Sequence, residues 1–231
     1  MYCLKYKGDH MYEIYETKER ITADNDKEAE KSRAYLKEKN VFLINLMGSP
    51  GCGKTTTLVR TINALKDQYR IGVMEADVDS DVDAETIHQL GVKVIQLHSG
   101  GLCHMDADMT ARGYMRMGID DLDVVILENI GNLVCPAEFD VGAAKKVMIL
   151  SVPEGDDKPL KYPLMFEVSD CLLINKIDTK AIFDFNEDLC AERVHKLNPD
   201  MEIFALSSKT GEGFDAWIEW LKQEIEEWRK A

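Results

Sequence analysis

Residues 48–55 form a glycine-rich stretch, GSPGCGKT, whose residue types and spacing suit phosphate binding. An apolar run precedes it and a helix-like segment, roughly Lys54–Gln68, follows it, as in a phosphate-binding loop between a strand and a helix. Glycines let backbone N–H groups turn toward phosphate oxygens, and the helix N-terminus adds a favourable dipole. We expect Lys54 to contact the β- and γ-phosphates and the Thr55 hydroxyl to bind Mg²⁺. The residues expected to bind nucleotide here are Gly48, Gly51, Cys52, Gly53, Lys54, Thr55 and Thr56.

The segment NKID at residues 175–178 predicts that the nucleotide base is guanine. The Asp178 carboxylate can accept hydrogen bonds from both N1–H and the exocyclic amine of guanine, whereas adenine has no donor at N1. Asn175 and Lys176 belong to the same pattern, and the stem of Lys176 can lie along the base plane. Because the segment follows an apolar run and accompanies a phosphate-binding loop, it is much more specific than it would be alone.

A second stretch supports the same base. Ser207, Ser208 and Lys209 follow the apolar run 202–206 and resemble the Ser-Ala-Lys loop that supports guanine in GTPases. Together with the phosphate-binding loop and NKID, they predict that GTP or GDP is bound rather than an adenine nucleotide.

Two carboxylates at the ends of apolar runs are candidate magnesium ligands, directly or through water. Asp77 opens an acidic segment, DVDSDVD, which otherwise reads as a solvated loop. Glu128 begins the pattern E-x-x-G with Gly131, which resembles the D-x-x-G switch of GTPases with Glu replacing Asp. Gly131 is expected to donate its N–H to the γ-phosphate, so that loss of this phosphate releases the loop. The candidate catalytic residues are Lys54, Asp77 and Glu128, and no water-orienting group can be named.

Cys103, His104 and Cys135 are candidate ligands of a second metal. Cys103 and His104 follow the apolar run 92–97, and Cys135 lies seven residues beyond Glu128. Loops at the carboxyl ends of parallel strands share one edge of a sheet, which would bring these side chains toward the nucleotide. Two thiolates and an imidazole suit Zn²⁺ or Ni²⁺ and leave one position open, unless two subunits pool their ligands. Spacing alone leaves the alternative open, which is two buried cysteines and a surface histidine.

The rest of the sequence indicates the elements that position these residues. Short apolar runs recur from residue 41 onward, and most are continuous rather than alternating, as in strands buried on both faces. Helix-like segments separate many of them, and the last one carries an apolar stripe from Phe214 to Trp228 at helical spacing. This alternation predicts an α/β fold, with a mostly parallel central sheet and helices on both faces. The predicted strands are 41–47, 70–76, 92–97, 123–128, 145–152, 171–175 and 202–206.

The chain divides by pattern into an N-terminal extension, residues 1–40, and a P-loop GTPase domain, residues 41–231. The first part of the extension alternates loosely and suggests a short hairpin. Residues 24–40 are charged and contain alanine, and their Asn25/Asp26 start predicts a surface helix.

Composition argues against several classes of function. The formal net charge of -14 at pH 7 disfavours a general nucleic-acid or anionic-membrane surface, because both attract basic patches. No run approaches the roughly 18 apolar residues of a membrane helix, and the N-terminus lacks the apolar core of a secretion signal. We therefore expect a cytoplasmic protein whose 6 cysteines are free thiols or metal ligands.

The segments NLMGSPGCGKTTTL, GGLCHMDADM and ENIGNLVCPAEFD resemble the hydrogenase nickel-incorporation GTPase family, HypB, and ENIGNLVCP is the most restrictive part. The resemblance runs from about Asn25 to the C-terminus. It implies a Mg²⁺-dependent GTPase and metallochaperone that forms a homodimer when GTP is bound. It also implies nickel or zinc binding at Cys103, His104 and Cys135 in the dimer interface. The implied partners are the large subunit of [NiFe]-hydrogenase and a small zinc-binding hydrogenase accessory protein, with no nucleic acid and no membrane.

Two alternative functions are weaker. The sister GTPase that matures urease shares the phosphate-binding loop and the guanine motif, but it is expected to carry a Cys-Pro-His motif that this sequence lacks. A nickel-buffering protein with a vestigial GTPase is opposed by the intact Lys54, Thr55 and Asp178, and by the absence of a His-rich tract from residues 1–40.

Overall fold

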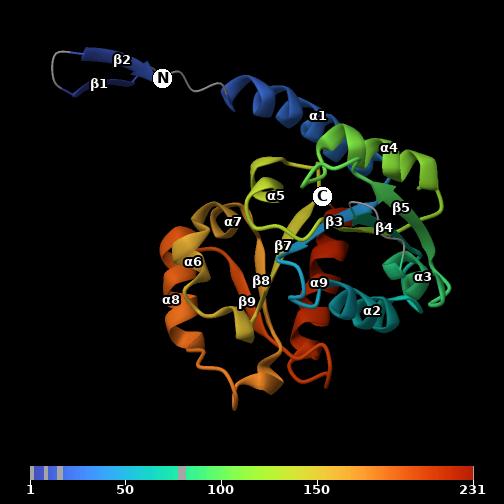
Figure 1. Cartoon of the computed structure of the whole chain (residues 1–231). Coiled ribbons are helices and arrows are strands. Elements are labelled where there is room, and N and C mark those ends of the chain that lie inside the picture. Colours follow the sequence, from blue (N-terminus) through green and yellow to red (C-terminus); the bar gives the residue numbers. More distant parts are fainter. Residues whose placement is uncertain (1–2, 8–9, 15–17, 78–81, 231) are drawn as a thin grey trace.

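Seven parallel strands form the central sheet, in the spatial order β5-β4-β6-β3-β7-β8-β9 (Figure 1). The structure is a computed structural model, which describes residues 3–7, 10–14, 18–77 and 82–230. Each predicted apolar run is a strand, and no strand end differs from its run by more than one residue. The strands are β3 (Phe42–Gly48), β4 (Ile71–Asp77), β5 (Lys93–His98), β6 (Val124–Glu128), β7 (Lys145–Ser151), β8 (Cys171–Asn175) and β9 (Glu202–Ala205).

Helices cover both faces of the sheet, which confirms the predicted fold class. One face packs against α2, α3 and α9, and the other against α1 and α4 on one side and α7 and α8 on the other (Figure 1). The central strands β3, β6 and β8 are buried along their whole length, which explains why their sequences are continuous apolar runs. The helices are α1 (Lys18–Glu38), α2 (Lys54–Leu65), α3 (Val82–His88), α4 (Ala107–Met117), α5 (Cys135–Glu138), α6 (Lys158–Lys161), α7 (Pro163–Val168), α8 (Glu187–Leu197) and α9 (Phe214–Lys230), with short 3₁₀ turns η1 (Val152–Glu154) and η2 (Ile177–Thr179).

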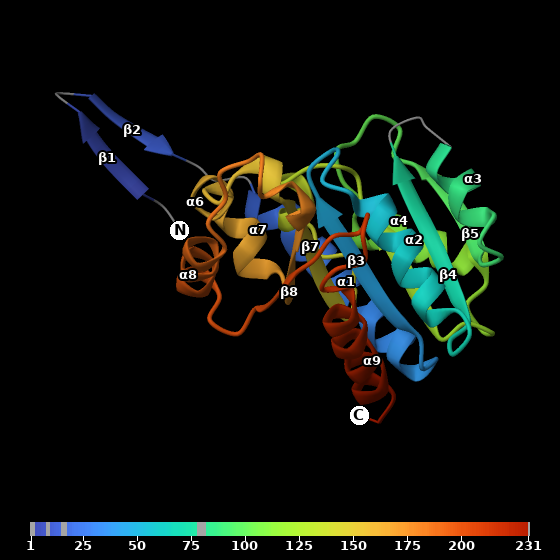
Figure 2. The same cartoon turned by 90° about the horizontal axis from the view of Figure 1, so that it is seen from below.

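The elements before β3 lie outside the central sheet. Strands β1 (Cys3–Lys7) and β2 (His10–Ile14) pair antiparallel as a separate hairpin (Figure 2). Helix α1 begins at Lys18, earlier than the predicted start at residue 24, and ends at Glu38. Asn25 therefore lies inside the helix, where its side chain makes tertiary hydrogen bonds instead of capping the helix start. No helix among the described residues is long and apolar enough to cross a membrane.

The order of the strands creates a place for a ligand. The chain passes from β3 toward β4 and β6 on one side and toward β7, β8 and β9 on the other. Ligands bind at such a reversal, outside the carboxyl ends of the strands. The loops after β3, β4, β6 and β8 all leave the sheet at this edge, and they carry the predicted nucleotide residues. Residues 78–81 of the acidic segment after Asp77 lie outside the described part of the chain.

Candidate functional site

Strand β3 runs into the glycine-rich loop, and α2 begins at its end with Lys54. Gly53 is the N-cap of α2 with φ of 101°, in the left-handed region that favours glycine. A Cβ atom at this position would lie 2.5 Å from Nδ2 of Asn175. Glycine is therefore required here both by the backbone and by a close neighbour. The loop has the strand–loop–helix geometry of an anion-binding helix N-terminus.

A cavity of about 680 Å³ lies beside this loop, at the carboxyl ends of β3, β4 and β6. Most of the predicted nucleotide and magnesium residues line it, namely Gly51, Gly53, Lys54, Thr55, Thr56, Asp77, Glu128, Gly131 and Lys176. Cys52 points into the core instead, where burial raises the pKa of its thiol to about 11. Such a thiol acts as a small packing side chain and not as a reactive one.

Cationic and oxygen groups meet at the inner end of the cavity. The Lys54 ammonium lies 3.4 Å from the carbonyl oxygen of Gly48 and 3.3 Å from that of Ser49. The Thr55 hydroxyl donates a 2.9 Å hydrogen bond to Oε1 of Glu128, and Asp77 lines the same cavity from the end of β4. One hydroxyl and two carboxylates form an oxygen donor set that fits Mg²⁺ next to phosphates.

Glu75 is a cavity residue that the sequence reasoning missed. It lies in β4, is buried, and is paired in register with Glu128 of β6. Alternation in a strand places Glu75 and Asp77 on the same face, so the spacing of the two acids was an available signal. The site therefore has an acidic wall of three carboxylates facing the phosphate-binding loop.

Glu154 is a second residue that the sequence reasoning missed. Its carboxylate accepts hydrogen bonds from the Ser49 hydroxyl, and from the backbone N–H and the hydroxyl of Ser151. Ser151 and Glu154 form a capping box at η1, which is visible in sequence. The contact with Ser49 is not visible there, because it joins loops that follow different strands.

The segment after β6 is laid against the glycine-rich loop. Asn129 donates its backbone N–H to the carbonyl of Leu46 at 2.9 Å, and Asn132 donates to the carbonyl of Gly48 at 3.1 Å. Between them, a Cβ atom on Gly131 would lie 3.0 Å from the backbone nitrogen of Pro50. Gly131 is thus a close backbone contact of the loop, where a side chain would force the two segments apart.

The Asn175 side chain joins three loops. Its Nδ2 donates to the carbonyl of Cys52 at 3.0 Å, and its Oδ1 accepts from the backbone N–H groups of Lys176 and Ser208, at 2.8 Å and 3.0 Å. Both ends of the amide are hydrogen-bonded to protein backbone, so the role of Asn175 is to hold these loops together around the nucleotide-binding region. Lys176 donates to the carbonyl of Gly51 at 2.6 Å.

Asp178, which follows β8, and Ser207, which follows β9, are hydrogen-bonded to each other. The Ser207 hydroxyl donates a 2.6 Å hydrogen bond to Oδ1 of Asp178 and accepts the backbone N–H of Thr210. Asp178 itself is exposed, and it is not among the residues that line the cavity. This bond fixes the carboxylate in one orientation, as a base-reading group requires.

The neighbouring loop is anchored to α2. The Ser208 hydroxyl lies 2.6 Å from that of Thr57, and Arg60 donates to the carbonyl oxygens of Ser208 and Lys209 at 2.9 Å and 3.1 Å. The Lys209 side chain is exposed. The loops predicted to bind base and phosphate are therefore parts of one connected structure.

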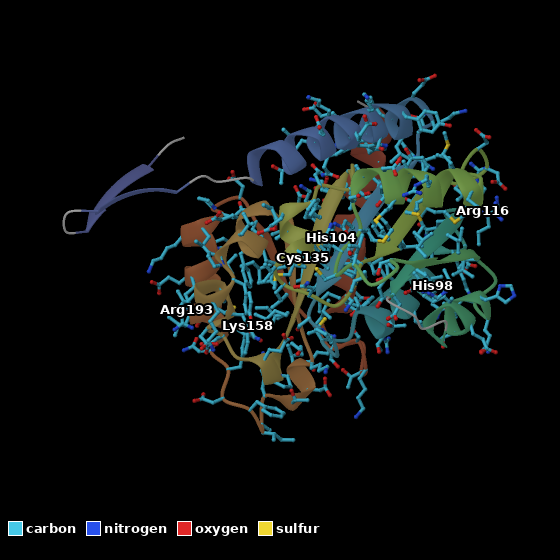
Figure 3. The ribbon with its side chains drawn as sticks, turned by 45° about the horizontal axis from the view of Figure 1, so that its top comes forward. His98, His104, Arg116, Cys135, Lys158 and Arg193 are labelled. Carbon is cyan, nitrogen blue, oxygen red and sulfur yellow. The ribbon has the colours of Figure 1, made fainter. Side chains whose placement is uncertain are left out.

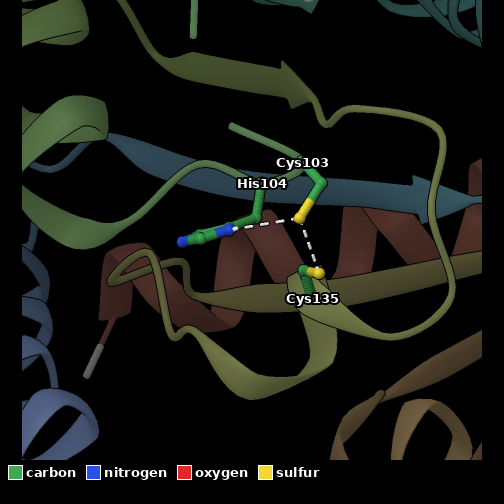
Figure 4. Close-up of side chains that lie close together, drawn as sticks. All are labelled: Cys103, His104 and Cys135. Carbon is green, nitrogen blue, oxygen red and sulfur yellow. Dashed lines mark hydrogen bonds between the residues drawn. The ribbon is translucent and has the colours of Figure 1, made fainter. Parts of the chain in front are cut away.

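Cys103, His104 and Cys135 come together in one group, and Figure 3 shows two of them, His104 and Cys135, near each other. The sulfur atoms of Cys103 and Cys135 are 2.7 Å apart, and Nδ1 of His104 lies 3.9 Å from the Cys103 sulfur (Figure 4). Their ligand atoms all lie within 4.8 Å of one another, and Cys103 is exposed. Two soft sulfur ligands and one imidazole at this separation match the donor set of a zinc or nickel site.

The His104 ring is held by an aromatic neighbour. It stacks on Phe139, with ring centroids 3.9 Å apart and planes within 16°. Burial lowers the pKa of His104, which favours the neutral imidazole that binds metals. The neighbouring Cys135 raises the pKa of the Cys103 thiol through their hydrogen bond. A bound cation would reverse this last effect, because it favours both thiolates.

Asn132 connects the cysteine–histidine group to the nucleotide site. Its Nδ2 donates to the carbonyl of Cys103 at 3.3 Å, and its Oδ1 accepts the backbone N–H of Val134 at 2.9 Å. Its own backbone N–H is the group bonded to Gly48 of the glycine-rich loop. One residue therefore touches the phosphate-binding loop and both segments that carry the sulfurs.

Comparisons with known proteins agree with this arrangement. The family model for the CobW/HypB/UreG nucleotide-binding domain matches residues 42–205. A protein of Azotobacter vinelandii called hydrogenase maturation factor HypB is 43% identical over 206 residues, which cover 88% of this chain and 67% of that protein. A probable hydrogenase maturation factor HypB of Methanocaldococcus jannaschii is 34% identical over 218 residues, covering 94% of this chain and 99% of the relative.

A solved structure has the same fold. The crystal structure of HypB from Helicobacter pylori in complex with nickel has a TM-score of 0.83 and 35% sequence identity, covering 88% of this chain and 96% of that one.

Proposed function

The chain belongs to the HypB branch of the CobW/HypB/UreG family, and from this premise we propose that it is a GTP-hydrolysing metallochaperone. It binds nickel or zinc at Cys103, His104 and Cys135, and it assists nickel insertion into the large subunit of [NiFe]-hydrogenase. The observation that carries the proposal is the position of Asn132, which touches the phosphate-binding loop and both cysteine-bearing segments. These contacts support a coupling between nucleotide binding and metal binding.

The nucleotide part of the proposal assigns roles to residues in the cavity. The N–H groups of the loop and of the α2 N-terminus bind the β- and γ-phosphates, and the Lys54 ammonium neutralises charge that develops during transfer. Thr55, Asp77 and Glu128 would hold Mg²⁺, directly or through water, and this ion would neutralise phosphate oxygens. Glu128 already orients the Thr55 hydroxyl. The Gly131 N–H, held beside Pro50, reads the γ-phosphate.

Base selection is assigned to Asp178, and replacing it with asparagine is expected to weaken GDP binding by about 10²-fold or more. The asparagine amide donates where the carboxylate accepts, so it opposes the exocyclic amine of guanine but pairs with the C2 carbonyl of xanthine. Affinities of labelled GDP and xanthosine diphosphate, measured by fluorescence, should move in opposite directions. Asp184→Asn, a nearby exposed position, is the matched control. Equal losses for both nucleotides would show that Asp178 does not read the base.

The metal part of the proposal includes a homodimer. Two residues beside the sulfurs are exposed apolar side chains, Leu102 at 46% and Val134 at 49% exposure. Burial of such side chains stabilises a contact between copies of the chain. Three ligands leave a position open on a tetrahedral ion, and ligands from a second copy can close it. A small zinc-binding accessory protein of the hydrogenase is proposed as the further partner in transfer.

The coupling of the two sites follows from the segment 129–135. The γ-phosphate attracts Gly131, and the resulting position of Asn132 sets where Cys103 and Cys135 stand. Hydrolysis removes this attraction and allows the segment to move, which changes the separation of the ligands. The metal is then bound differently in the GTP and GDP states, as release to a partner requires.

A titration of Ni²⁺ into the protein tests this coupling. With Mg²⁺ present, the Ni²⁺ dissociation constant is expected to differ by about fivefold or more between GDP and a non-hydrolysable GTP analogue. In Asn132→Ala the difference should shrink toward zero, because the bond to the Cys103 carbonyl is lost, whereas Asn186→Ala at the distant N-cap of α8 should keep it. Equal Ni²⁺ affinities in both nucleotide states of the wild type would contradict the proposed switch.

A further inference from the structure

One side chain of helix α1, Asn25, is hydrogen-bonded to both segments that continue from the cysteine–histidine group. Its Oδ1 accepts the backbone N–H of Ala107 at 2.9 Å, and its Nδ2 donates to the carbonyl of Asp140 at 2.9 Å. We propose that Asn25 is a positioning residue for the metal site, clamping the segment that carries Cys103 and His104 to the segment that carries Cys135. The inference rests on the proposed metal binding and adds the N-terminal helix to the machinery that sets it.

The two hydrogen bonds of Asn25 end on the segments that follow His104 and Cys135 in the chain. Ala107 is the first residue of α4 and lies three residues after His104. Asp106, between them, is the N-cap of α4, and its side chain accepts the N–H of Met109 at 2.8 Å. Asp140 follows Phe139, whose ring stacks on His104. Asn25 thus sets the distance between the backbone that follows His104 and the backbone that carries its stacking partner.

Helix α1 is anchored well enough to act as a fixed support. Arg33 donates to the carboxylate of Asp140 at 2.8 Å and to the carbonyl of Ala143 at 3.0 Å. The backbone of α1 also lies close to the loop at 140–143, since a Cβ on Gly142 would lie 2.8 Å from the carbonyl oxygen of Ala29. Asn25, Ala29 and Arg33 are four residues apart in turn and share one face of the helix. This face is pressed against the segment that continues from Cys135.

The same helix is also anchored to α4. The Tyr114 hydroxyl donates to Ser32 at 3.3 Å, and the rings of Tyr35 and Tyr114 stack at 6.2 Å. Leu36 is almost fully buried beneath them. Because α1 is attached independently to α4 and to the loop at 140–143, it spans the two segments as a rigid strap. Asn25 is the residue of this helix whose side chain is hydrogen-bonded to both segments of the site.

The chemistry of the amide explains why asparagine suits this position. A single side chain must accept from one backbone N–H and donate to one backbone carbonyl, and an amide does both. Aspartate can accept from Ala107 but repels the Asp140 carbonyl, and alanine makes neither bond. Groups that hydrogen-bond to metal ligands change metal affinity by about 10–100-fold when removed, and Asn25 acts one step further out, on backbone three residues after His104. Loss of these two hydrogen bonds should therefore weaken Ni²⁺ binding and leave nucleotide affinity unchanged.

The experiment compares Ni²⁺ binding by the wild type, Asn25→Ala and Asn25→Asp, using competition with a chromophoric chelator and the thiolate-to-nickel charge-transfer absorption. Asn25→Ala is expected to weaken Ni²⁺ binding by about 10-fold or more and to change the absorption band. Asn25→Asp keeps the bond to Ala107, so its Ni²⁺ affinity should lie between those of the wild type and Asn25→Ala. Affinity for labelled GDP should stay within about twofold of the wild type in both variants, because neither bond touches the cavity.

Two controls separate the possible outcomes. Asn186→Ala removes an equivalent asparagine at the N-cap of α8, and it should leave both Ni²⁺ affinity and the absorption band unchanged. Cys103→Ala removes a proposed ligand. If Cys103→Ala binds Ni²⁺ as the wild type does, the proposed metal site itself is wrong. If Cys103→Ala loses Ni²⁺ while both Asn25 variants bind it with wild-type affinity and spectrum, only the clamp is overturned.

Discussion

Replacing Lys54 with alanine is expected to lower kcat for GTP hydrolysis by about 10³-fold. The Lys54 ammonium is nearly buried at the inner end of the cavity, within 3.4 Å of the carbonyl oxygens of Gly48 and Ser49. A fixed positive charge in this enclosed place is worth far more to the transferring phosphoryl group than it would be in water. Phosphate release at saturating GTP, in the presence of Mg²⁺, measures the effect.

Matched controls make this result specific. Lys66→Ala removes an exposed lysine just beyond the other end of α2, and it should hydrolyse GTP at the wild-type rate. Ni²⁺ binding by Lys54→Ala without nucleotide should be unchanged, because Lys54 contacts none of the three metal residues. Unchanged turnover in Lys54→Ala would mean that the loop does not catalyse hydrolysis, and it would favour a nickel-buffering function.

Replacing Cys135 with alanine is expected to weaken Ni²⁺ binding by about 100-fold or more. The substitution removes one of two sulfurs that lie 2.7 Å apart, and a site with one thiolate and one imidazole holds a soft ion only weakly. Basal GTP turnover should change by less than about threefold, since Cys135 does not line the nucleotide cavity. Metal analysis after size exclusion, with and without a GTP analogue, reports both the bound ion and the dimer.

A second cysteine provides the comparison for Cys135. Cys190 is a buried thiol in α8 that packs against the sheet and is not one of the three grouped metal residues. Its replacement with alanine should lower the free energy of unfolding, through lost packing, but it should not change Ni²⁺ affinity. Equal nickel content in Cys135→Ala and the wild type would remove this residue from the ligand set. A GTP-dependent dimer that persists without metal would show that nucleotide alone brings the two copies together.

Local patterns were enough to predict most of the fold. The runs that became β3, β6 and β8 are continuous and apolar because the strands are covered on both faces. The helical stripe of Phe214, Trp217 and Leu221 is likewise the buried face of α9. Such patterns reflect burial of each element separately, so they can be read without knowing the neighbours. The start of α1 was misplaced because Asn25 looks like a cap in sequence, while in the structure it lies inside the helix.

The candidate site was predictable only where its parts are contiguous. The glycine-rich loop and the segment at 175–178 are each one short stretch, and the backbone geometry that they need is encoded in their own residues. Glu75 and Glu154 escaped notice for a different reason. Each matters through a neighbour on another element, Glu128 in one case and Ser49 in the other. The spacing of Glu75 and Asp77 and the capping box at Glu154 are visible within their own segments, but neither pattern identifies that neighbour.

By itself, the sequence determined that this protein has a parallel sheet, a phosphate-binding loop and a guanine motif, because short-range periodicity and backbone requirements specify each of them. Only the tertiary structure decided that Cys103 lies against Cys135, because their loops follow β5 and β6, which are separated in the sheet by β4. It likewise decided that Asn132 and Asn25 join these loops to the nucleotide site and to α1. Such contacts depend on the packing of segments far apart in the chain, which local propensity does not specify.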